Sequence, residues 1–319
     1  MQWIQGNSPI SFPGLGLKNF DLPSGFTIGP LSVNFYGLLI ALGLMLAVIY
    51  AWKRCKEFGI REDHLTDGVL VIVPFAIICT RAFYVIFKWD ELFAANPISA
   101  LYIWNGGLAI FGGIIGAAIG VVAYALIRKI KLPALLDLVA LGFLIGQCIG
   151  RWGNFFNREA FGAETESFLR MGLKLTADGG YASSFSYYHP TFLYESLWNL
   201  GGFIILHILS YKRKYDGQIA LGYALWYGLG RAVIEGLRTD SMYIGPIRLN
   251  QLLAALACAT AAIVLLVMAF KEHDPKNLLV NQVAAQKAAE EAALEADLAE
   301  NDNEESEAVE ETEEGSEAE

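Results

Sequence analysis

Long apolar runs are the feature that most limits what this chain can fold into. A membrane-spanning helix needs about 20 predominantly apolar residues, and a soluble domain rarely contains several such runs. The runs predict an all-α integral membrane protein with seven transmembrane helices. The sixth is the weakest, because it contains Arg231 and Glu235. The candidate spans are residues 31–52, 66–87, 107–127, 133–151, 191–210, 217–237 and 248–270.

Basic residues occupy alternate short loops, after the first, third and fifth spans. The loop after the second span instead has Lys88 beside Asp90 and Glu91. Because loops rich in lysine and arginine stay in the cytoplasm, the N-terminus is predicted outside and the C-terminus in the cytoplasm. The basic residues are Lys53, Arg54, Lys56 and Arg61, then Arg128, Lys129 and Lys131, then Lys212, Arg213 and Lys214.

Four regions follow from this arrangement. Residues 1–30 lack the basic start and early apolar core of a signal peptide, so they predict an extracytoplasmic arm. Residues 31–270 form the transmembrane domain, and the long segment 152–190 between spans four and five predicts a small extracytoplasmic cap. Residues 271–319 are mainly acidic and small, which predicts a disordered cytoplasmic tail with at most a frayed helix over 281–299.

The four cysteines do not have the spacing of a metal site. Cys55, Cys79, Cys148 and Cys258 lie in or beside apolar runs and show no CxxC pair. We interpret them as packing residues and predict no metal site.

Polar residues from every span converge on the predicted outer leaflet. A charged side chain at the centre of a span costs roughly 2.5–3.5 kcal/mol on insertion scales, so each one indicates a function. Arg81, Arg151 and Arg231 lie in outer halves of their spans. Guanidinium groups bind phosphate through paired hydrogen bonds, and the phosphates of a leaflet are phospholipid head groups. For Arg81 and Arg231, an internal ion pair with Glu195 or Glu235 is the alternative.

One helical stripe carries four of these polar residues. Tyr227, Arg231, Glu235 and Arg238 recur at intervals that place them on one face of the sixth span. Cations fixed beside a departing phosphate stabilise its growing negative charge. Arg151 and Arg231 are therefore the first candidates for catalysis.

An anion transporter or channel and a structural scaffold are the two alternative functions for a chain with these spans. An anion transporter or channel gathers arginines too, but it usually has polar residues through the whole bilayer depth and often an internal repeat. A structural scaffold has no need of converging charge. The cytoplasmic halves of these spans are apolar apart from Asp67, Asp137 and His207, and the sequence shows no repeat.

Three stretches resemble one family. The run GRWGNFFNREAFG (150–162) closely resembles the signature of the prolipoprotein diacylglyceryl transferases, and HPTFLYES (189–196) resembles a second motif. The stripe on the sixth span resembles a third. The resemblance covers about residues 30–270 and leaves out the acidic tail.

The resemblance implies a reaction and a location. The family transfers the diacylglyceryl group of phosphatidylglycerol to the lipobox cysteine thiol of a prolipoprotein signal peptide. A thioether forms and glycerol 1-phosphate leaves, which is the first step of bacterial lipoprotein maturation. The resemblance implies no metal, no soluble cofactor and no nucleic-acid partner. It places a multi-pass protein in the bacterial plasma membrane, in contact with the bilayer, with its active site facing outward.

The resemblance also extends the list of site residues, because Tyr36, Asn154, Glu159 and Gly162 match family positions. The predicted catalytic residues are Arg151, Arg231, Tyr36, Glu235 and His189. The predicted phosphatidylglycerol-binding residues are Arg151, Asn154, Arg81, Glu159, Gly162, Tyr227 and Arg238.

At one position the chain departs from the family. Many members have a histidine after the segment that resembles GGLAI, and a role as general base has been attached to it. This chain has Phe111 there, which cannot accept a proton. Either that histidine is not required, or His189, Tyr36 or Glu235 removes the proton from the thiol.

Overall fold

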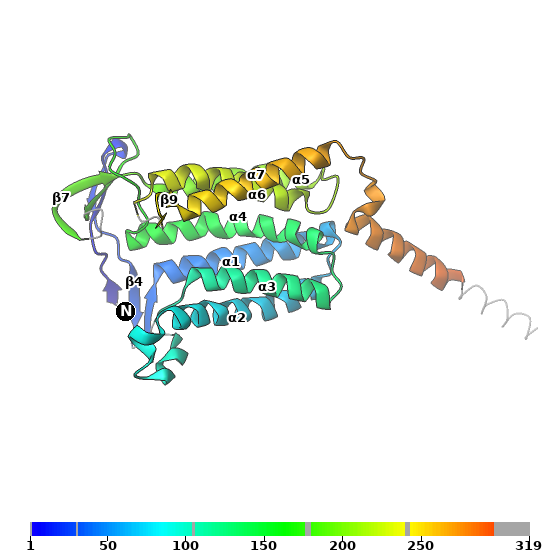
Figure 1. Ribbon diagram of the computed structural model, residues 1–319, viewed down its shortest axis with the longest axis horizontal. Helices are drawn as coiled ribbons and strands as arrows, with labels where there is room; N and C mark the ends of the chain where they lie inside the picture. The colour runs from blue at the N-terminus through cyan, green and yellow to red at the C-terminus, as the bar shows by residue number, and fades with distance from the viewer. Residues whose placement is uncertain (1, 30, 104–105, 176–179, 240–242, 297–319) are drawn as a thin grey trace, which may run out of the picture.

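Seven long helices form the body of the protein. The computed structural model describes residues 2–29, 31–103, 106–175, 180–239 and 243–296. In Figure 1 the helices lie side by side along the longest axis of the molecule. They are α1 (Phe35–Arg54), α2 (Glu62–Phe87), α3 (Ile110–Ile127), α4 (Leu132–Asn157), α5 (Thr191–Ser210), α6 (Gln218–Ile234) and α7 (Leu249–Ala269).

Each predicted span corresponds to one of these helices. Within the described ranges, six are long and apolar enough to cross a membrane, and α6 is not among them. α6 has 17 residues, so it is about 26 Å long. A 3-10 turn at Glu235–Leu237 continues it to the end of the predicted sixth span.

The helices pack mainly with particular neighbours. α1 lies along α4, α4 along α5, α6 along α7, and α2 forms a pair with α3 at one edge of the bundle (Figure 1). We call the end at which α1, α3, α5 and α7 begin the cap end, and the opposite end the tail end. The centre of the bundle is apolar, since Leu138, Leu141 and Leu144 of α4 are completely buried.

Short strands gather at the cap end, so the prediction of an all-α protein is wrong in this respect. Two sheets have the strand orders β1-β4-β5 and β3-β2-β6-β7, and β8 pairs with β9. The pairs are all antiparallel. The strands are β1 (Gln2–Ile4), β2 (Ile10–Phe12), β3 (Leu17–Phe20), β4 (Gly25–Ile28), β5 (Leu31–Asn34), β6 (Met171–Leu175), β7 (Tyr181–Tyr188), β8 (Tyr243–Ile244) and β9 (Ile247–Arg248).

The N-terminal arm and the cap share one sheet. β2 of the arm pairs with β6 of the cap, with Ile10 opposite Leu173, and both of these side chains are completely buried. A buried arginine reinforces this joint. Arg158, just after α4, donates to the carbonyl oxygens of Ser8 at 3.0 Å and of Leu22. Burial lowers the pKa of its guanidinium below the ordinary value, and nearby Asp21 opposes that shift.

The segment that follows α7 turns back onto the tail end. The Leu279 amide donates to Asp216 Oδ2 at 2.9 Å, and Lys131 Nζ donates to the carbonyl oxygen of Asn277. Leu278 is buried, and Leu279 packs against the core of the bundle. Residues 279–296 are helical. The first part of the predicted tail thus contacts the bundle at residues 277–279 and continues as a helix, which the prediction of a helix over 281–299 allows, while residues 297–319 lie outside the described residues.

Candidate active site

A buried carboxylate at the cap end gathers three arginine side chains. Glu195 lies in the second turn of α5, and only 4% of its side chain is exposed. Its oxygens lie 2.7 Å from Arg151 Nη2 of α4 and 3.4 Å from Arg238 Nη1. Arg231 Nη1 of α6 donates to both oxygens, at 3.0 and 3.1 Å. Residues of α4, α5 and the α6 region therefore meet at one point.

A second buried carboxylate completes the cluster. Glu235 Oε2 lies 2.6 Å from Arg231 Nη2 and 3.9 Å from Arg238 Nε. Asn250 Nδ2 of α7 donates to Glu235 Oε1 at 3.2 Å. Arg248 Nη1 donates to the backbone oxygen of Glu235 at 2.9 Å. Glu235 thereby connects the turn after α6 to the start of α7.

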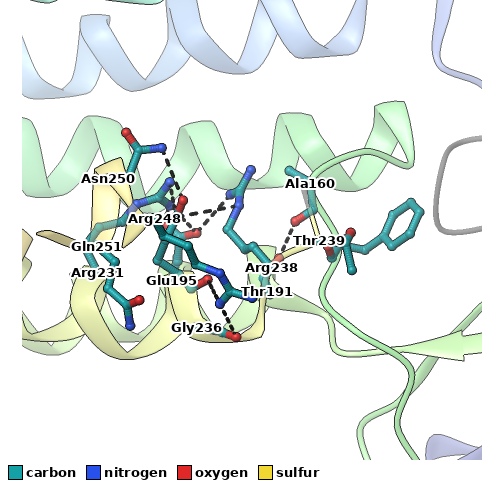
Figure 2. Close-up of polar contacts among 12 residues, drawn as sticks. Ala160, Thr191, Glu195, Arg231, Gly236, Arg238, Thr239, Arg248, Asn250 and Gln251 are labelled. Atoms are coloured by element: carbon teal, nitrogen blue, oxygen red, sulfur yellow. Dashed lines mark hydrogen bonds and ion pairs between the residues drawn. The ribbon is translucent and has the colours of Figure 1, made fainter. Parts of the chain in front are cut away.

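The arginines of the cluster keep an accessible side while the carboxylates do not. The side chains of Arg151, Arg231 and Arg238 are 22%, 13% and 10% exposed, whereas that of Glu235 is fully buried. Figure 2 shows Arg231 and Arg238 gathered around Glu195. The sequence predicts that Arg231 either binds phosphate or forms an internal ion pair. The geometry is compatible with both, because Arg231 forms internal ion pairs and remains accessible to a ligand.

A chain of hydrogen bonds leads from the cluster into the predicted signature. Arg151 Nη1 donates to Asn154 Oδ1 at 3.3 Å. Asn154 Nδ2 in turn donates to Glu159 Oε1 at 3.0 Å, and Asn157 Nδ2 donates to the same oxygen at 3.3 Å. Glu159 thus orients Asn154, and Asn154 orients Arg151. The last turn of α4 and the residues after it form one polar unit.

Tyr36 reaches this unit from α1. A β-carbon at position 153 would lie 2.6 Å from Tyr36 Cδ2, so only glycine lets the ring lie this close to α4. Glu159 and Arg151 are the charged groups near the Tyr36 hydroxyl. The structure therefore places Tyr36 against the end of α4, near Arg151 and Glu159.

Gly162 and His189 form the joint between the cap and α5. The Gly162 amide donates to the His189 carbonyl at 2.9 Å, and the His189 amide donates to the Ala163 carbonyl at 3.0 Å. A β-carbon on Gly162 would lie 2.8 Å from Cβ of His189 and 2.9 Å from the carbonyl oxygen of Leu237. The His189 ring contacts the Tyr194 hydroxyl at 3.2 Å. Both residues hold the backbone that leads into α5 and Glu195.

Tyr227 lies one turn before Arg231 on α6. Its ring stacks on that of Tyr223, with centroids 5.6 Å apart and planes 10° from parallel. The hydroxyl of Tyr223 accepts a hydrogen bond from Gln147 Nε2 of α4 at 3.0 Å. The aromatic pair continues the stripe from the charged cluster toward the middle of the bundle.

Arg81 serves a different part of the molecule. Its Nε, Nη1 and Nη2 donate to backbone oxygens between α2 and α3, and its guanidinium lies 5.3 Å from the ring centre of Phe93. The acceptors are Ala100 at 2.8 Å, Gly106 at 2.7 Å, Gly107 and Ser99 at 2.9 Å, and Tyr102 at 3.4 Å. This differs from the predicted role in binding phosphatidylglycerol, because the N–H groups that a phosphate would need already donate to the loop.

Phe111 lies in the first turn of α3, at the cap end. Its side chain is 38% exposed. The structure therefore places Phe111 at the same end of the bundle as the cluster. Because the residue is partly exposed, a polar ring such as that of histidine also fits there.

Glu195 is the residue whose importance sequence reasoning underestimates. The sequence predicts it only as a possible ion-pair partner, although three arginines meet on it. The available signal is its place in a span, because a carboxylate there is as costly as an arginine. Asn250, at the start of the seventh span, carries the same weaker signal.

Comparison with known proteins agrees with the motifs. Residues 23–268 match the model of a family described as prolipoprotein diacylglyceryl transferase. A phosphatidylglycerol–prolipoprotein diacylglyceryl transferase of Clostridium novyi (strain NT) is 46% identical over 233 residues, covering 73% of this chain and 90% of the relative. Relatives with the same description in Listeria monocytogenes (serotype 4a, strain HCC23) and Bacillus velezensis (strain FZB42) are 41% and 39% identical. They cover 76% and 80% of this chain, and 88% and 94% of their own lengths.

Proposed function

The chain belongs to the prolipoprotein diacylglyceryl transferase family, and on that premise we propose that the arginines around Glu195 form its active site. The protein is a bacterial multi-pass membrane enzyme. It transfers the diacylglyceryl group of phosphatidylglycerol to prolipoprotein, the first step of lipoprotein maturation. The observation that carries the proposal is the meeting of Arg151, Arg231 and Arg238 on one buried carboxylate.

The arginines hold the phosphate of the donor lipid. Arg151 and Arg231 are ordered by Glu195 before a ligand arrives, so little reorganisation is needed when charge develops. The lipobox thiol attacks the glyceryl carbon, the bond from this carbon to the phosphate oxygen breaks, and glycerol 1-phosphate leaves. As the bond breaks, negative charge moves onto the phosphate oxygens beside the guanidinium groups.

The cysteine reacts as a thiolate, and the arginines favour that form. A free thiol has a pKa near 8.5, and an opposite charge within a few ångströms lowers a pKa by about 1–3 units. Because the reacting sulfur approaches the same phosphate group, the cationic cluster increases its thiolate fraction. The proton passes to solvent or to a nearby acceptor, for which Tyr36, His189 and Glu235 remain candidates.

The cap end faces the outside of the cell, and all seven helices span the membrane. The basic loops between α1 and α2, α3 and α4, and α5 and α6 lie at the tail end, which supports a cytoplasmic tail end. The 3-10 turn after α6 adds length to the shortest span. The buried leucines of α4 support an enzyme rather than an anion channel, because they fill the middle of the bundle.

A direct assay tests the activity. The purified protein is incubated in vesicles with phosphatidylglycerol and a peptide that carries a lipobox cysteine, and the peptide is analysed by mass spectrometry. We expect a mass gain of one diacylglyceryl group, blocked when the cysteine is replaced by serine. A correctly folded protein that gives no such product would contradict the proposed function.

The orientation has its own test. A green fluorescent protein fused after Ala296 should fluoresce in intact bacteria, because it folds efficiently in the cytoplasm but not after export through the general secretion pathway. A fusion exported to the outside, judged by a periplasmic or surface reporter at the same position, would contradict a cytoplasmic tail end.

A further inference from the structure

We propose that a neutral polar layer beneath the arginine cluster binds the hydroxyl groups of the phosphatidylglycerol head group, through Gln147 and Asn199. The inference rests on the proposed function and deepens it, because it assigns residues that distinguish a glycerol head group from other head groups. Both residues contact the lipid away from the bond that breaks, so their role is in specificity.

The layer lies one helical turn below the charged cluster, on the side of the tail end. Gln147 precedes Arg151 by four residues on α4. Asn199 follows Glu195 by four residues on α5, which runs in the opposite direction. Tyr227 has the corresponding position on α6. Because residues four apart share one face of a helix, these side chains lie about 5.4 Å deeper in the bundle than the charged groups.

Hydrogen bonds between helices hold α4, α5 and α6 together at this level. The pairs are Gln147 and Tyr223 at 3.0 Å, Ser196 and the Cys148 carbonyl oxygen at 2.8 Å, and Trp198 and Trp226, whose indoles donate to each other's carbonyl oxygens at 2.9 Å. Asn199 follows Trp198 directly on α5 and is 1% exposed. Gln147 and Asn199 therefore belong to one level of the bundle.

Two oxygen atoms of this layer lack a hydrogen-bond donor. Among the described residues, Gln147 Oε1 and Asn199 Oδ1 are buried and have no partner. Buried polar groups are nearly always hydrogen-bonded, and an exception needs a specific explanation. An apolar side chain at either position would avoid the cost of burying an amide. The two oxygens therefore indicate a ligand that brings donors to this level.

The head-group glycerol is the part of the donor lipid that carries donors. Its hydroxyl groups donate and accept hydrogen bonds, whereas the phosphodiester and the acyl esters only accept them. The acyl chains stay in the bilayer. With the phosphate on the arginines, the head group on its other side can enter between α4, α5 and α6. The amides and phenols of the layer are neutral, so they offer no counter-ion to an ammonium head group.

A ligand reaches the layer past partly exposed side chains. Gln147, Tyr223 and Tyr227 are neither fully buried nor fully exposed. The two oxygens themselves are covered, so side-chain rotation opens the layer when the head group enters. The terminal torsion of an amide side chain is broad, which makes such a rotation easy.

Phosphatidylpropanol tests the inference, because it keeps the acyl chains, the phosphodiester and the charge of phosphatidylglycerol but lacks both hydroxyl groups. Transfer to a lipobox peptide is measured in vesicles of each lipid, and the values of kcat/KM are compared. The wild type should prefer phosphatidylglycerol by at least about tenfold, because a site built to bind hydroxyl groups rejects an analogue without them. Equal values would overturn the inference and leave water as the partner of the two oxygens.

Asn199→Leu and Gln147→Leu remove the two acceptors from different helices, so one variant remains if the other does not fold. Each should lower the preference for phosphatidylglycerol by at least about threefold, by slowing that lipid more than phosphatidylpropanol. Variants that slow both lipids equally would contradict the inference, because a residue that only supports the fold or contacts the peptide behaves in this way.

Ser196→Ala is the matched control. It also changes a buried polar side chain of α5, but the Ser196 hydroxyl already donates to the carbonyl oxygen of Cys148. The variant should keep the wild-type preference between the two lipids, whatever its stability. A preference that falls as far as in Asn199→Leu would show that any change in this layer disturbs the site, and the assignment to Asn199 would be wrong.

Binding of soluble phosphates separates this inference from the proposed function. sn-Glycerol 1-phosphate and propyl phosphate have the same charge and differ in their hydroxyl groups, and calorimetry measures their binding to the detergent-solubilised protein. We expect the wild type to bind the glycerol phosphate at least about tenfold more tightly, and Asn199→Leu to lose most of this difference. If transfer fails but this difference is found, the proposed function falls and the head-group site stands. If transfer proceeds and the two phosphates bind equally, the inference is overturned.

Discussion

Four arginines, Arg81, Arg151, Arg158 and Arg231, divide into two groups by the partners that bind their donors, and the partner determines the role. Arg81 and Arg158 are held by backbone carbonyl oxygens, so their donors are occupied by the fold itself. Arg151 and Arg231 are held by carboxylates and remain partly accessible. An arginine bound to a carboxylate can also bind a phosphate ligand on its accessible side. An arginine bound to backbone carbonyl oxygens must first break those hydrogen bonds.

We expect Arg151→Ala and Arg231→Ala to reduce transfer by about a hundredfold to a thousandfold, the usual cost of removing one donor aimed at developing charge. The assay is the rate of thioether formation in vesicles, with thermal unfolding measured in parallel. Arg170→Ala is the control, because this cap arginine donates to the carbonyl oxygens of Glu166 and Ser167 at 3.1 Å. Near-normal rates in folded Arg151 and Arg231 variants would contradict a phosphate-binding role.

Phe111 permits a test of whether the thiol needs a dedicated base. If nearby arginines already lower the thiol pKa by about 1–3 units, a base adds little. Phe111→His should then change the rate by less than about tenfold between pH 6 and pH 9. Phe111→Leu controls for the loss of the aromatic ring. A large gain on introducing histidine, absent in the leucine variant, would show that proton removal limits this enzyme.

At the scale of elements, the conformation of the loop between α2 and α3 depends on the hydrogen bonds of one side chain, that of Arg81. Arg81 donates to carbonyl oxygens of Ser99, Ala100, Tyr102, Gly106 and Gly107. Buried polar groups that lose their partner cost about 1–3 kcal/mol each. The loop leads directly into α3, so the side chain fixes where that helix begins.

We expect Arg81→Met to destabilise the protein by about 2–5 kcal/mol, visible as a lower thermal unfolding temperature. The apparent KM for phosphatidylglycerol should stay unchanged in the fraction that remains folded, because Arg81 has no donor left for the lipid. Arg128→Ala is the matched control. It removes a half-exposed ion pair with Asp67, which contributes at most about 1 kcal/mol. A raised KM with normal stability in Arg81→Met would restore the lipid-binding role.

The helices could be predicted from the sequence, and the strands could not. A run of about 20 mainly apolar residues predicts a transmembrane helix by itself, because a helix satisfies its backbone hydrogen bonds within the segment. β2 has three residues, and its partner β6 lies far along the chain. Such a strand has no pattern of its own, because pairing with a distant segment creates it.

The same distinction applies to the site. The helical stripe groups Arg231, Glu235 and Arg238 by their spacing alone, and the structure keeps them together. The sequence could not indicate that Glu195 contacts three arginines from two other helical regions, since that depends on how α4, α5 and α6 pack. Nor could it indicate that the loop before α3 would occupy the donors of Arg81.

At the scale of the whole molecule, the two ends of the bundle are built differently. Short strands gather at the cap end, whereas at the tail end the segment after α7 contacts the bundle before its helix runs away from it (Figure 1). Leu278 and Leu279 pack there, and Asp216 accepts the Leu279 amide at 2.9 Å. The contacts link the region after α7 to the loop between α5 and α6.

We therefore expect two truncations to behave differently. A chain that ends after Ala296 should match the full chain in stability and activity. A chain that ends after His273 loses the buried Leu278, and burial of one leucine contributes about 1.5–3 kcal/mol. Its unfolding temperature should fall, while the activity of the folded fraction stays within a few-fold. The measurement is thermal unfolding together with transfer per folded protein. Loss of activity without loss of stability would indicate a role for the tail in catalysis.

The joint between arm and cap also has a consequence for biosynthesis. Arg158 and its acceptor Ser8 are separated by 150 residues. At about 5–20 residues per second, the ribosome needs about 8–30 s to make this stretch. During that interval α1 to α4 are synthesised while β2 has no β6 to pair with. The arm therefore completes this sheet late, after α4 has been synthesised, and the edge of β2 that pairs with β6 stays unpaired until then.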